Sequence, residues 1–299
     1  MLTGWLVVNG YITNPKFLEI YQWLADAGTR QGIRMERKTN VELMEQFCRL
    51  EGKMEKEKRP DFVIFWDKDV RLAALMEKAG LRLFNSADAI AACDDKSMTY
   101  IRLKQEGIRM PRTWLAPKTF AKDGYEQKEF FVHAGEELGY PVVVKECFGS
   151  FGFQVYLAHD RQELEQIVAQ LKNAPFLLQE YIANSEGRDI RIQMVGEEAV
   201  ACMYRYNDGD FRANITNGGK MKAYTPNAEQ IRVAQKACRC LGLDFAGVDL
   251  LFGDGEEPVL CEVNSNAHFK NIYTCTGINV ADKILTYIKR IVEKGEGQE

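Results

Sequence analysis

Histidine is scarce in this sequence, and the cysteines form no recognisable metal-binding pattern. The 299 residues include three histidines and eight cysteines, and only Cys238 and Cys240 are close neighbours, as a CxC pair. Neither residue type has the spacing of a zinc site, and no CxxC pair is present. Scattered cysteines in a chain of this length predict reduced thiols and a cytoplasmic location.

Positive charge is not in excess, and long apolar runs are missing. Lysine and arginine number 39 against 43 acidic residues, a formal net charge of −4. This balance argues against nucleic acid or a membrane surface as a partner. No apolar run approaches the roughly 18 residues of a membrane span. The opening MLTGWLVVNG has no basic lead or cleavage site, so it is interpreted as a strand, not a signal peptide.

Two common nucleotide-binding motifs are absent as well. The sequence contains no GxxxxGK[ST], the motif of a Walker loop. The segment that follows the first expected strand, VVNGYITNP, has no GxGxxG. A dehydrogenase of the Rossmann type is therefore disfavoured.

What the sequence does contain is an alternation of apolar strands and amphipathic helices, with mostly strands later. The first part predicts strands at residues 5–8, 61–67 and 81–85, and helices at 14–32, 70–80 and 86–107. Such alternation favours an α/β layer with a parallel sheet. Residues 108–182 predict a small α+β unit with a glycine-rich turn, and the remainder a mostly antiparallel sheet with flanking helices.

Residues 141–153, PVVVKECFGSFGF, combine a strand, a lysine and a glycine-rich turn. Lys145 ends the strand, and Gly149 and Gly152 bracket Ser150 and Phe151. Glycines let backbone N–H groups close over an anion, and the lysine adds a point charge, so the segment favours phosphate binding. An ordinary glycine hairpin with a surface lysine is the alternative.

Two further segments are rich in polar groups that suit a nucleotide. FLLQEYI (176–182) ends in Glu180, Tyr181 and Ile182, which could bind an adenine, and Asp189 follows nine residues after Glu180. RYNDGDFRANITNGG (205–219) holds a pair of arginines, an asparagine and two glycines, namely Arg205, Arg212, Asn214, Gly218 and Gly219. Arginine forks bind phosphate or carboxylate. The alternatives are a solvated strand edge and an exposed loop.

The pattern of polar residues in two apolar strands near the C-terminus favours a metal site. FAGVDLLF (245–252) contains Asp249, and CEVN (261–264) contains Glu262 and Asn264. Residues two apart on a strand face the same side, so Glu262 and Asn264 point to one spot. Three oxygen ligands on adjacent strands suit Mg²⁺ with nucleotide phosphates. A salt bridge from Asp249 or Glu262 to an arginine is the alternative.

Taken in order, these segments resemble the ATP-grasp superfamily, and within it the RimK-like ligases of the α-L-glutamate ligase type. The resemblance implies an α/β protein with an ATP-grasp fold, in which two α+β subdomains clamp ATP behind a Rossmann-like pre-ATP-grasp domain. The expected divisions are residues 1–90, 91–183 and 184–299, the second beginning with the entry helix of CDDKSMTYIRLKQEGIRMPRTW.

The resemblance also assigns roles to individual residues. Nucleotide binding is implied for Lys96, Lys145, Gly149, Ser150, Gly152, Glu180, Tyr181, Ile182, Asp189, Arg212 and Asn214. Within that set, Lys145, Arg212 and Asn214 are the expected catalytic residues. Asp249, Glu262 and Asn264 match the Mg²⁺ ligands, with two ions expected and Mn²⁺ as the alternative metal.

The activity implied is that of an ATP-dependent carboxylate–amine ligase. A substrate carboxylate is phosphorylated by ATP, and an amine then displaces phosphate to form an amide. The expected substrates are glutamate or another amino acid and a small-molecule, peptide or protein acceptor, with a dimer or tetramer by analogy. A small-molecule kinase of the same fold and a non-catalytic ATP-binding module are the alternatives.

The sequence leaves the family pattern just after Asn264, where SNAHFKN replaces the usual Pro-Gly and aromatic residue. This strip is expected near the acceptor. The candidate substrate residues are Arg191, Arg205, Gly219, His268 and Lys270. A hydrogen-bonded structural histidine is the alternative for His268, and an ion pair with Asp189 is the alternative for Arg191.

Overall fold

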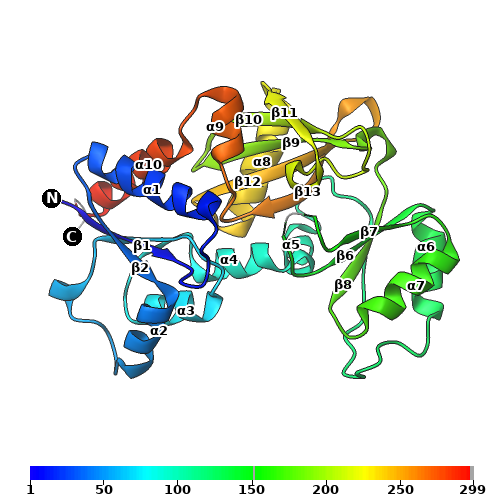
Figure 1. The fold of residues 1–299 in the computed structure, drawn as a ribbon, viewed down its shortest axis with the longest axis horizontal. Helices are drawn as coiled ribbons and strands as arrows, with labels where there is room; N and C mark the ends of the chain where they lie inside the picture. The colour runs from blue at the N-terminus through cyan, green and yellow to red at the C-terminus, as the bar shows by residue number, and fades with distance from the viewer. Residues whose placement is uncertain (151, 297–299) are drawn as a thin grey trace.

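The computed structural model describes residues 1–150 and 152–296. Phe151 of the glycine-rich segment and residues 297–299 lie outside this range. The described strands form three sheets of four, four and five strands (Figure 1). Within the described part of the chain, no helix is both long and apolar enough to cross a membrane.

The N-terminal sheet is parallel, which confirms the α/β layer predicted for the start of the chain. Its order is β2-β1-β3-β4, and all three strand pairs are parallel. The strands are β1 (Thr3–Val8), β2 (Arg34–Thr39), β3 (Phe62–Phe65) and β4 (Leu83–Phe84), and the helices α1 (Pro15–Arg30), α2 (Asn40–Arg49) and α3 (Val70–Lys78) connect them. The carboxyl ends of the strands therefore meet at one edge.

The sequence analysis does not predict β2 and α2. Strand β2 reads RMERKT, with Met35 as its one apolar residue, so it carries no apolar alternation. Helix α2 does carry a local signal that the periodicity argument passed over. Thr39 and Glu42 form a capping box, in which each side chain binds the backbone N–H of the other residue.

The helix predicted over residues 86–107 is two helices, α4 (Ala87–Asp94) and α5 (Lys96–Leu103). Asp95 causes the break, because its carboxylate accepts hydrogen bonds from the backbone N–H groups of Ser97 and Met98 and starts a new helix. Lys96 is consequently the first residue of α5, and its backbone N–H donates to the carbonyl of Cys147 at 3.0 Å.

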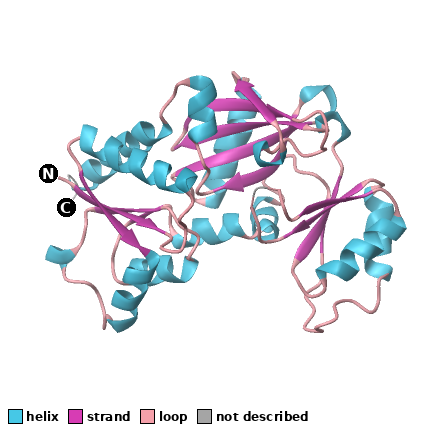
Figure 2. Ribbon diagram, viewed as in Figure 1, coloured by secondary structure: helices cyan, strands magenta, loops and turns pink. Residues whose placement is uncertain are grey.

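The second sheet is antiparallel, in the order β5-β8-β6-β7. It contains β5 (Thr113–Leu115), β6 (Val142–Glu146), β7 (Val155–Ala158) and β8 (Phe176–Glu180). Helices α6 (Glu129–Leu138) and α7 (Arg161–Leu171) lie together on its outer side (Figure 2). Helix α6 was not predicted, although the buried Phe131, Ala134 and Leu138 have helical spacing.

The third sheet is antiparallel and separates apolar from polar side chains. Its order is β11-β10-β9-β12-β13, with β9 (Arg188–Val195), β10 (Glu198–Tyr206), β11 (Lys220–Ala223), β12 (Phe245–Phe252) and β13 (Pro258–Asn264). Ile190, Ile192 and Met194 of β9 pack in one core with α8 (Ala228–Leu241). The intervening Asp189 and Arg191 therefore point to the opposite face.

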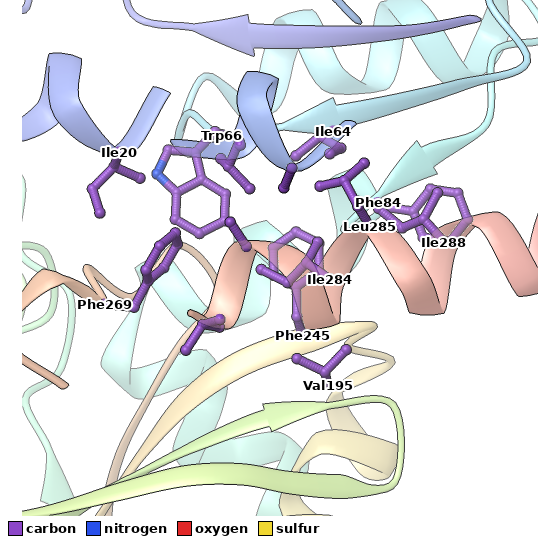
Figure 3. Packing of buried hydrophobic residues seen from close by; sticks show 14 of the residues in the cluster. Ile20, Ile64, Trp66, Phe84, Val195, Phe245, Phe269, Ile284, Leu285 and Ile288 are labelled. Atoms are coloured by element: carbon purple, nitrogen blue, oxygen red, sulfur yellow. The ribbon is translucent and has the colours of Figure 1, made fainter. Parts of the chain in front are cut away.

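Aromatic packing joins the N-terminal sheet to the third sheet (Figure 3). Trp66 stacks on Phe245 with 5.5 Å between ring centroids, and Phe269 meets Trp66 edge-on at 5.7 Å. Helix α9 (Lys270–Thr276) follows Phe269, and α10 (Val280–Glu296) adds Ile284, Leu285 and Ile288 to the same core. The first and third expected divisions, residues 1–90 and 184–299, thus contribute to one core.

We expect replacement of Phe269 by alanine to lower the free energy of unfolding by about 3–5 kcal/mol, because its ring is fully buried and would leave a cavity. Urea unfolding followed by circular dichroism measures the change. Phe120, which is 85% exposed, is the matched control. A Phe120→Ala protein should stay within about 0.5 kcal/mol of the parent protein, and equal losses in the two variants would contradict this assignment.

Candidate functional site

The glycine-rich segment between β6 and β7 packs against the loop that carries Asn214. Gly152 has a φ of +77°, and a Cβ atom there would lie 2.8 Å from Oδ1 of Asn214. Only glycine meets both demands, a left-handed backbone and this close approach. The structure therefore brings together two segments that the sequence analysis assigned separately to phosphate binding.

Two lysine ammonium groups converge near this segment. Lys96 donates a hydrogen bond from Nζ to the carbonyl of Gly149 at 3.3 Å, and Nζ of Lys145 lies 3.6 Å from Sγ of Cys261. Both lysines line one pocket, together with Glu262 from β13. Two cations and one carboxylate at a partly apolar pocket suit a phosphate chain carried by a divalent metal.

The same pocket contains Gln179, which the sequence analysis did not select. Its amide nitrogen donates to Oγ1 of Thr113 at 2.9 Å, while its Oε1 is buried without a hydrogen-bond partner. A buried unpaired acceptor is costly, and a ligand N–H would satisfy it. The sequence signal was present, because a glutamine stands at the end of the apolar strand FLLQ.

The side chain of Glu180 is held by the protein itself. Its carboxylate accepts hydrogen bonds from Nε of Arg112 at 2.7 Å and from the backbone N–H of the same residue at 3.0 Å. The bonds anchor the end of β8 to the connector before β5. Tyr181 and Ile182, the other two residues of the predicted hinge, follow directly after this strand.

Four charged side chains form a ladder of ion pairs on the polar face of the third sheet. Arg205 binds Asp189 through two hydrogen bonds of 2.6 and 2.7 Å and lies 3.0 Å from Asp249. Arg191 binds Asp249 through two further bonds of 2.6 Å. Arg191 thus pairs with Asp249 and not with Asp189, which corrects the alternative offered for it. The alternative for Asp249, a salt bridge to an arginine, is present in the structure, because Asp249 pairs with both Arg191 and Arg205.

The ion pairs and the loss of solvent act in opposite directions on these carboxyl groups. Burial favours the neutral form of Asp249, but the charges of Arg191 and Arg205 outweigh it and lower the pKa of Asp249. For Asp189, burial outweighs the single bidentate partner Arg205 and raises the pKa. The two carboxyl groups therefore differ in the direction of their pKa shift.

The predicted metal ligands lie on the neighbouring strands β12 and β13. Asp249 stands opposite Glu262 in the strand register, and Gly247 stands opposite Asn264. Glu262 forms no ion pair with any described residue, and the amide nitrogen of Asn264 is buried without a partner. No group of three His, Cys, Asp or Glu side chains within the described ranges could hold a metal. A metal bound at these strands would therefore need an amide oxygen as one of its ligands. Two carboxylates and one amide suit Mg²⁺.

Arg212 fastens the glycine-rich segment to the loop after β10. Its guanidinium binds both carboxylate oxygens of Asp210, at 3.0 and 2.7 Å, and donates to the carbonyl of Gly152 at 2.7 Å. Gly219 lies close behind, and its backbone N–H donates to the carbonyl of Asn214 at 3.2 Å. The two arginines proposed from one sequence segment, Arg205 and Arg212, therefore have separate surroundings.

His268 and Lys270 contact α1, although the sequence analysis selected them for substrate binding. Nε2 of His268 lies 2.9 Å from the carbonyl oxygen of Lys16, and its ring meets Phe17 edge-on. Lys270 forms an ion pair with Glu19. The geometry favours the alternative of a structural histidine, and both side chains join α9 to the N-terminal unit.

Ser150 has a neighbour from the N-terminal unit that the sequence analysis did not foresee. Nζ of Lys68 lies 3.5 Å from Oγ of Ser150 and 2.7 Å from a carboxylate oxygen of Asp94. Lys68 comes from the turn after β3, far away in the sequence. The glycine-rich segment is thus within reach of a third lysine, one that only the fold brings there.

Comparison with known proteins agrees with this geometry. A family model described as a RimK-like ATP-grasp domain matches residues 93–288, about two thirds of the chain. The chain belongs to the RimK-like ATP-grasp family. The resemblance inferred from the sequence is therefore confirmed, and the match includes both lysines of the pocket and the expected metal ligands.

Relatives of this family member carry the names of ligases and synthases. A probable alpha-L-glutamate ligase of Enterobacter sp. (strain 638) is 35% identical over 73% of this chain and 71% of its own length. Human N-acetylaspartylglutamate synthase A is 34% identical over 74% of this chain. The match spans 56% of that longer synthase, so the remainder of the synthase has no counterpart here.

The solved structures confirm the ATP-grasp fold. The structure of D-alanine–D-alanine ligase from Bacillus anthracis complexed with ATP superimposes with a TM-score of 0.74. It covers 100% of this chain and 99% of that chain at 17% identity, a level at which the likeness concerns the fold.

We expect replacement of Arg205 by methionine to lower the free energy of unfolding by about 3–5 kcal/mol, because Asp189 would remain buried without its cation. Chemical denaturation measures the loss. The matched control is Arg49→Met, since the Arg49–Glu45 pair is exposed at 79% and 66% of the two side chains. That variant should change stability by less than about 1 kcal/mol, and an equally mild Arg205 variant would contradict the prediction.

Proposed function

We propose that this protein is an ATP-dependent ligase that joins a carboxylate to an amine through an acyl phosphate. The observation that carries the proposal is the convergence of Lys96, Lys145 and Glu262 on one pocket, in a chain of the RimK-like ATP-grasp family. Relatives named glutamate ligase and N-acetylaspartylglutamate synthase support glutamate or another amino acid as one substrate. The acceptor is then a small molecule, a peptide or a protein carboxyl terminus.

In this proposal the two lysines and the glycine-rich segment hold the phosphates of ATP. Lys145 and Arg212 stabilise the charge on the phosphoryl group in transfer, and Asn214 supports the glycine-rich segment or contacts the nucleotide itself. The hinge of Glu180, Tyr181 and Ile182 binds the adenine, chiefly through its backbone because Arg112 occupies the Glu180 carboxylate. Asp189 contacts the ribose of the nucleotide in this proposal. Positioning and electrostatics suffice for such a transfer.

The metal ligands in this proposal are Asp249, Glu262 and Asn264. Mg²⁺, as two ions or replaced by Mn²⁺, would neutralise phosphate charge there when bound. Glu262 is free of ion pairs among the described side chains and faces the pocket that both lysines line. Asp249 is held between two guanidinium groups, so part of its charge is already compensated.

Substrate carboxylate binding is best assigned to Arg191 in this proposal. Its side chain is 15% exposed, against 4% for Arg205, so it has more room to meet a ligand. Gly219 remains a candidate through its backbone.

None of the eight cysteines, all of them described, forms a disulfide, which supports a cytoplasmic location. A dimer or tetramer is proposed by analogy with the family.

The direct test is a screen of ADP release with Mg·ATP and pairs of the twenty amino acids and small peptides, with mass analysis of the products. We expect ADP release that depends on both a carboxylate and an amine, and trapping of the acyl phosphate by hydroxylamine. A Lys145→Met protein should lose about 100-fold or more of this rate. Lys122→Met, on an exposed loop, should keep it.

The screen also identifies the competing activities. ADP release with a hydroxyl substrate and no amine would replace the ligase proposal with a kinase. Nucleotide binding without ADP release from any substrate pair would overturn catalysis altogether.

We expect replacement of Glu262 by glutamine to weaken Mn²⁺ binding by roughly tenfold or more in the presence of ADP, because one anionic ligand is lost. Electron paramagnetic resonance of free Mn²⁺ measures this without any turnover. Glu126→Gln, on the exposed loop before α6, should bind the ion like the parent protein. Unchanged Mn²⁺ binding in the Glu262 variant would remove Glu262 from the ligand set.

A further inference from the structure

The N-terminal sheet has a topological switch point at an edge that the proposed nucleotide site does not use. The strand order β2-β1-β3-β4 reverses direction at β1, since the chain passes to one side for β2 and to the other for β3. In open parallel sheets, ligands bind outside the carboxyl ends of the strands at such a switch point. Asn9 follows β1 directly, and Asp67 lies two residues after β3, so both flank this point.

Asp67 is a buried carboxylate with no cation beside it. It is 8% exposed and accepts hydrogen bonds from the amide of Asn9 at 3.2 and 3.3 Å and from the backbone N–H of Lys68 at 2.7 Å. No lysine, arginine or histidine of the described chain forms an ion pair with it. The nearest in sequence, Lys68, turns its ammonium to Asp94 instead.

Such a carboxylate is costly unless a cation joins it. Burial raises the pKa of Asp67, and the nearby charge of Asp69 adds to this effect, although hydrogen bonds to Lys68 and Asn9 act against it. The stability of the folded chain would gain from a positive group placed here. No described lysine, arginine or histidine supplies such a group by an ion pair.

A second unsatisfied acceptor lies at the same place. The amide nitrogen of Asn266 donates to the backbone carbonyl of Asp67 at 2.7 Å, and Oδ1 of Asn266 is buried without a partner. Asn266 comes from the strip that follows the expected metal ligands and departs from the family pattern. Asp67 and Asn266 therefore offer a carboxylate and an amide oxygen, both of which accept hydrogen bonds from N–H groups.

We propose that Asn9, Asp67 and Asn266 form a cluster that binds the ammonium group of an amino-acid substrate. The inference rests on the ligase function proposed above and adds to it the class of substrate and the residues that select it. Asp67 pairs with the ammonium, Asn266 accepts one of its hydrogen bonds, and Asn9 is a positioning residue that orients the Asp67 carboxylate.

The neighbourhood of Arg191 fits the other end of such a substrate. A Cβ atom at Gly247 would collide with Cβ of Ala267 and would lie 3.5 Å from Cδ of Arg191. The strip Asn266–Ala267 thus passes close to the guanidinium that we assign to the substrate carboxylate. An ammonium at Asp67 and a carboxylate toward Arg191 describe a zwitterion.

The test is isothermal titration calorimetry on the whole chain saturated with Mg·ADP. The probes are the twenty L-amino acids, followed by the tightest binder beside its deamino analogue, in which hydrogen replaces the ammonium. We expect at least one amino acid to bind and its analogue to bind about 30-fold more weakly or worse, the order expected for losing a buried charge pair. Asp67→Asn should bind both equally weakly, with its ADP affinity unchanged.

Two further variants keep the result interpretable. Asp123→Asn, which changes an exposed aspartate, should bind all probes like the parent protein. Asn266→Ala should weaken the amino acid more than its analogue, and it decides the matter where Asp67→Asn fails to fold or to bind ADP. The proposal is overturned by a parent protein that binds no amino acid, or by variants that keep the parent's preference for the ammonium form.

Failure of this inference and failure of the ligase proposal give different results. Amino-acid binding through Asp67 without ADP release would keep the ammonium-binding cluster and overturn the ligase. Amine-dependent ADP release with full preference for the ammonium in the Asp67 and Asn266 variants would keep the ligase and overturn the ammonium-binding cluster.

Discussion

The paired charges on the inner face of the third sheet are the constraint on which the site depends. Arg205 and Arg191 hold Asp189 and Asp249 in bidentate contact at 2.6–2.7 Å, away from solvent. Isolated charges could not be buried there, because the loss of hydration would exceed any packing gain. Pairing fixes the side chains and keeps Asp249 ionised beside Glu262.

The surrounding architecture presents this face to its ligands from two sides. The second sheet brings the two lysines of the pocket within reach through β6 and the start of α5, while Arg212 ties the glycine-rich segment across the gap. The N-terminal sheet closes the other side through Trp66, Phe245 and Phe269. Because this aromatic core is continuous, it fixes the position of Asp67 relative to the strip after Asn264.

The strip from Asn266 to Lys270 connects the two sides. It departs from the sequence pattern of the family, and its residues divide between two tasks. His268 and Lys270 bind α1, whereas Asn266 binds the backbone of Asp67 and leaves an oxygen free. Under the proposed function, such a division would let a change in this short loop alter substrate choice without altering the residues proposed for the nucleotide.

The sequence by itself determined the fold class and the order of most elements, and it predicted the residues that we propose for phosphate and metal binding. These follow from local patterns: alternating strands and helices, glycines beside a lysine, and carboxylates inside apolar strands. It did not determine β2, whose residues are polar, or the break at Asp95, where a capping carboxylate overrides the apolar periodicity.

Only the tertiary structure decided which charged side chains form ion pairs with each other. Arg191 meets Asp249 instead of Asp189 because facing residues on antiparallel neighbours are set by strand register, which spacing along one strand does not specify. Asp67 stands out by its burial, Gln179 by a buried oxygen without a hydrogen-bond partner, and Lys68 by its contact with Ser150. Those properties depend on residues distant in sequence, so no local pattern could supply them.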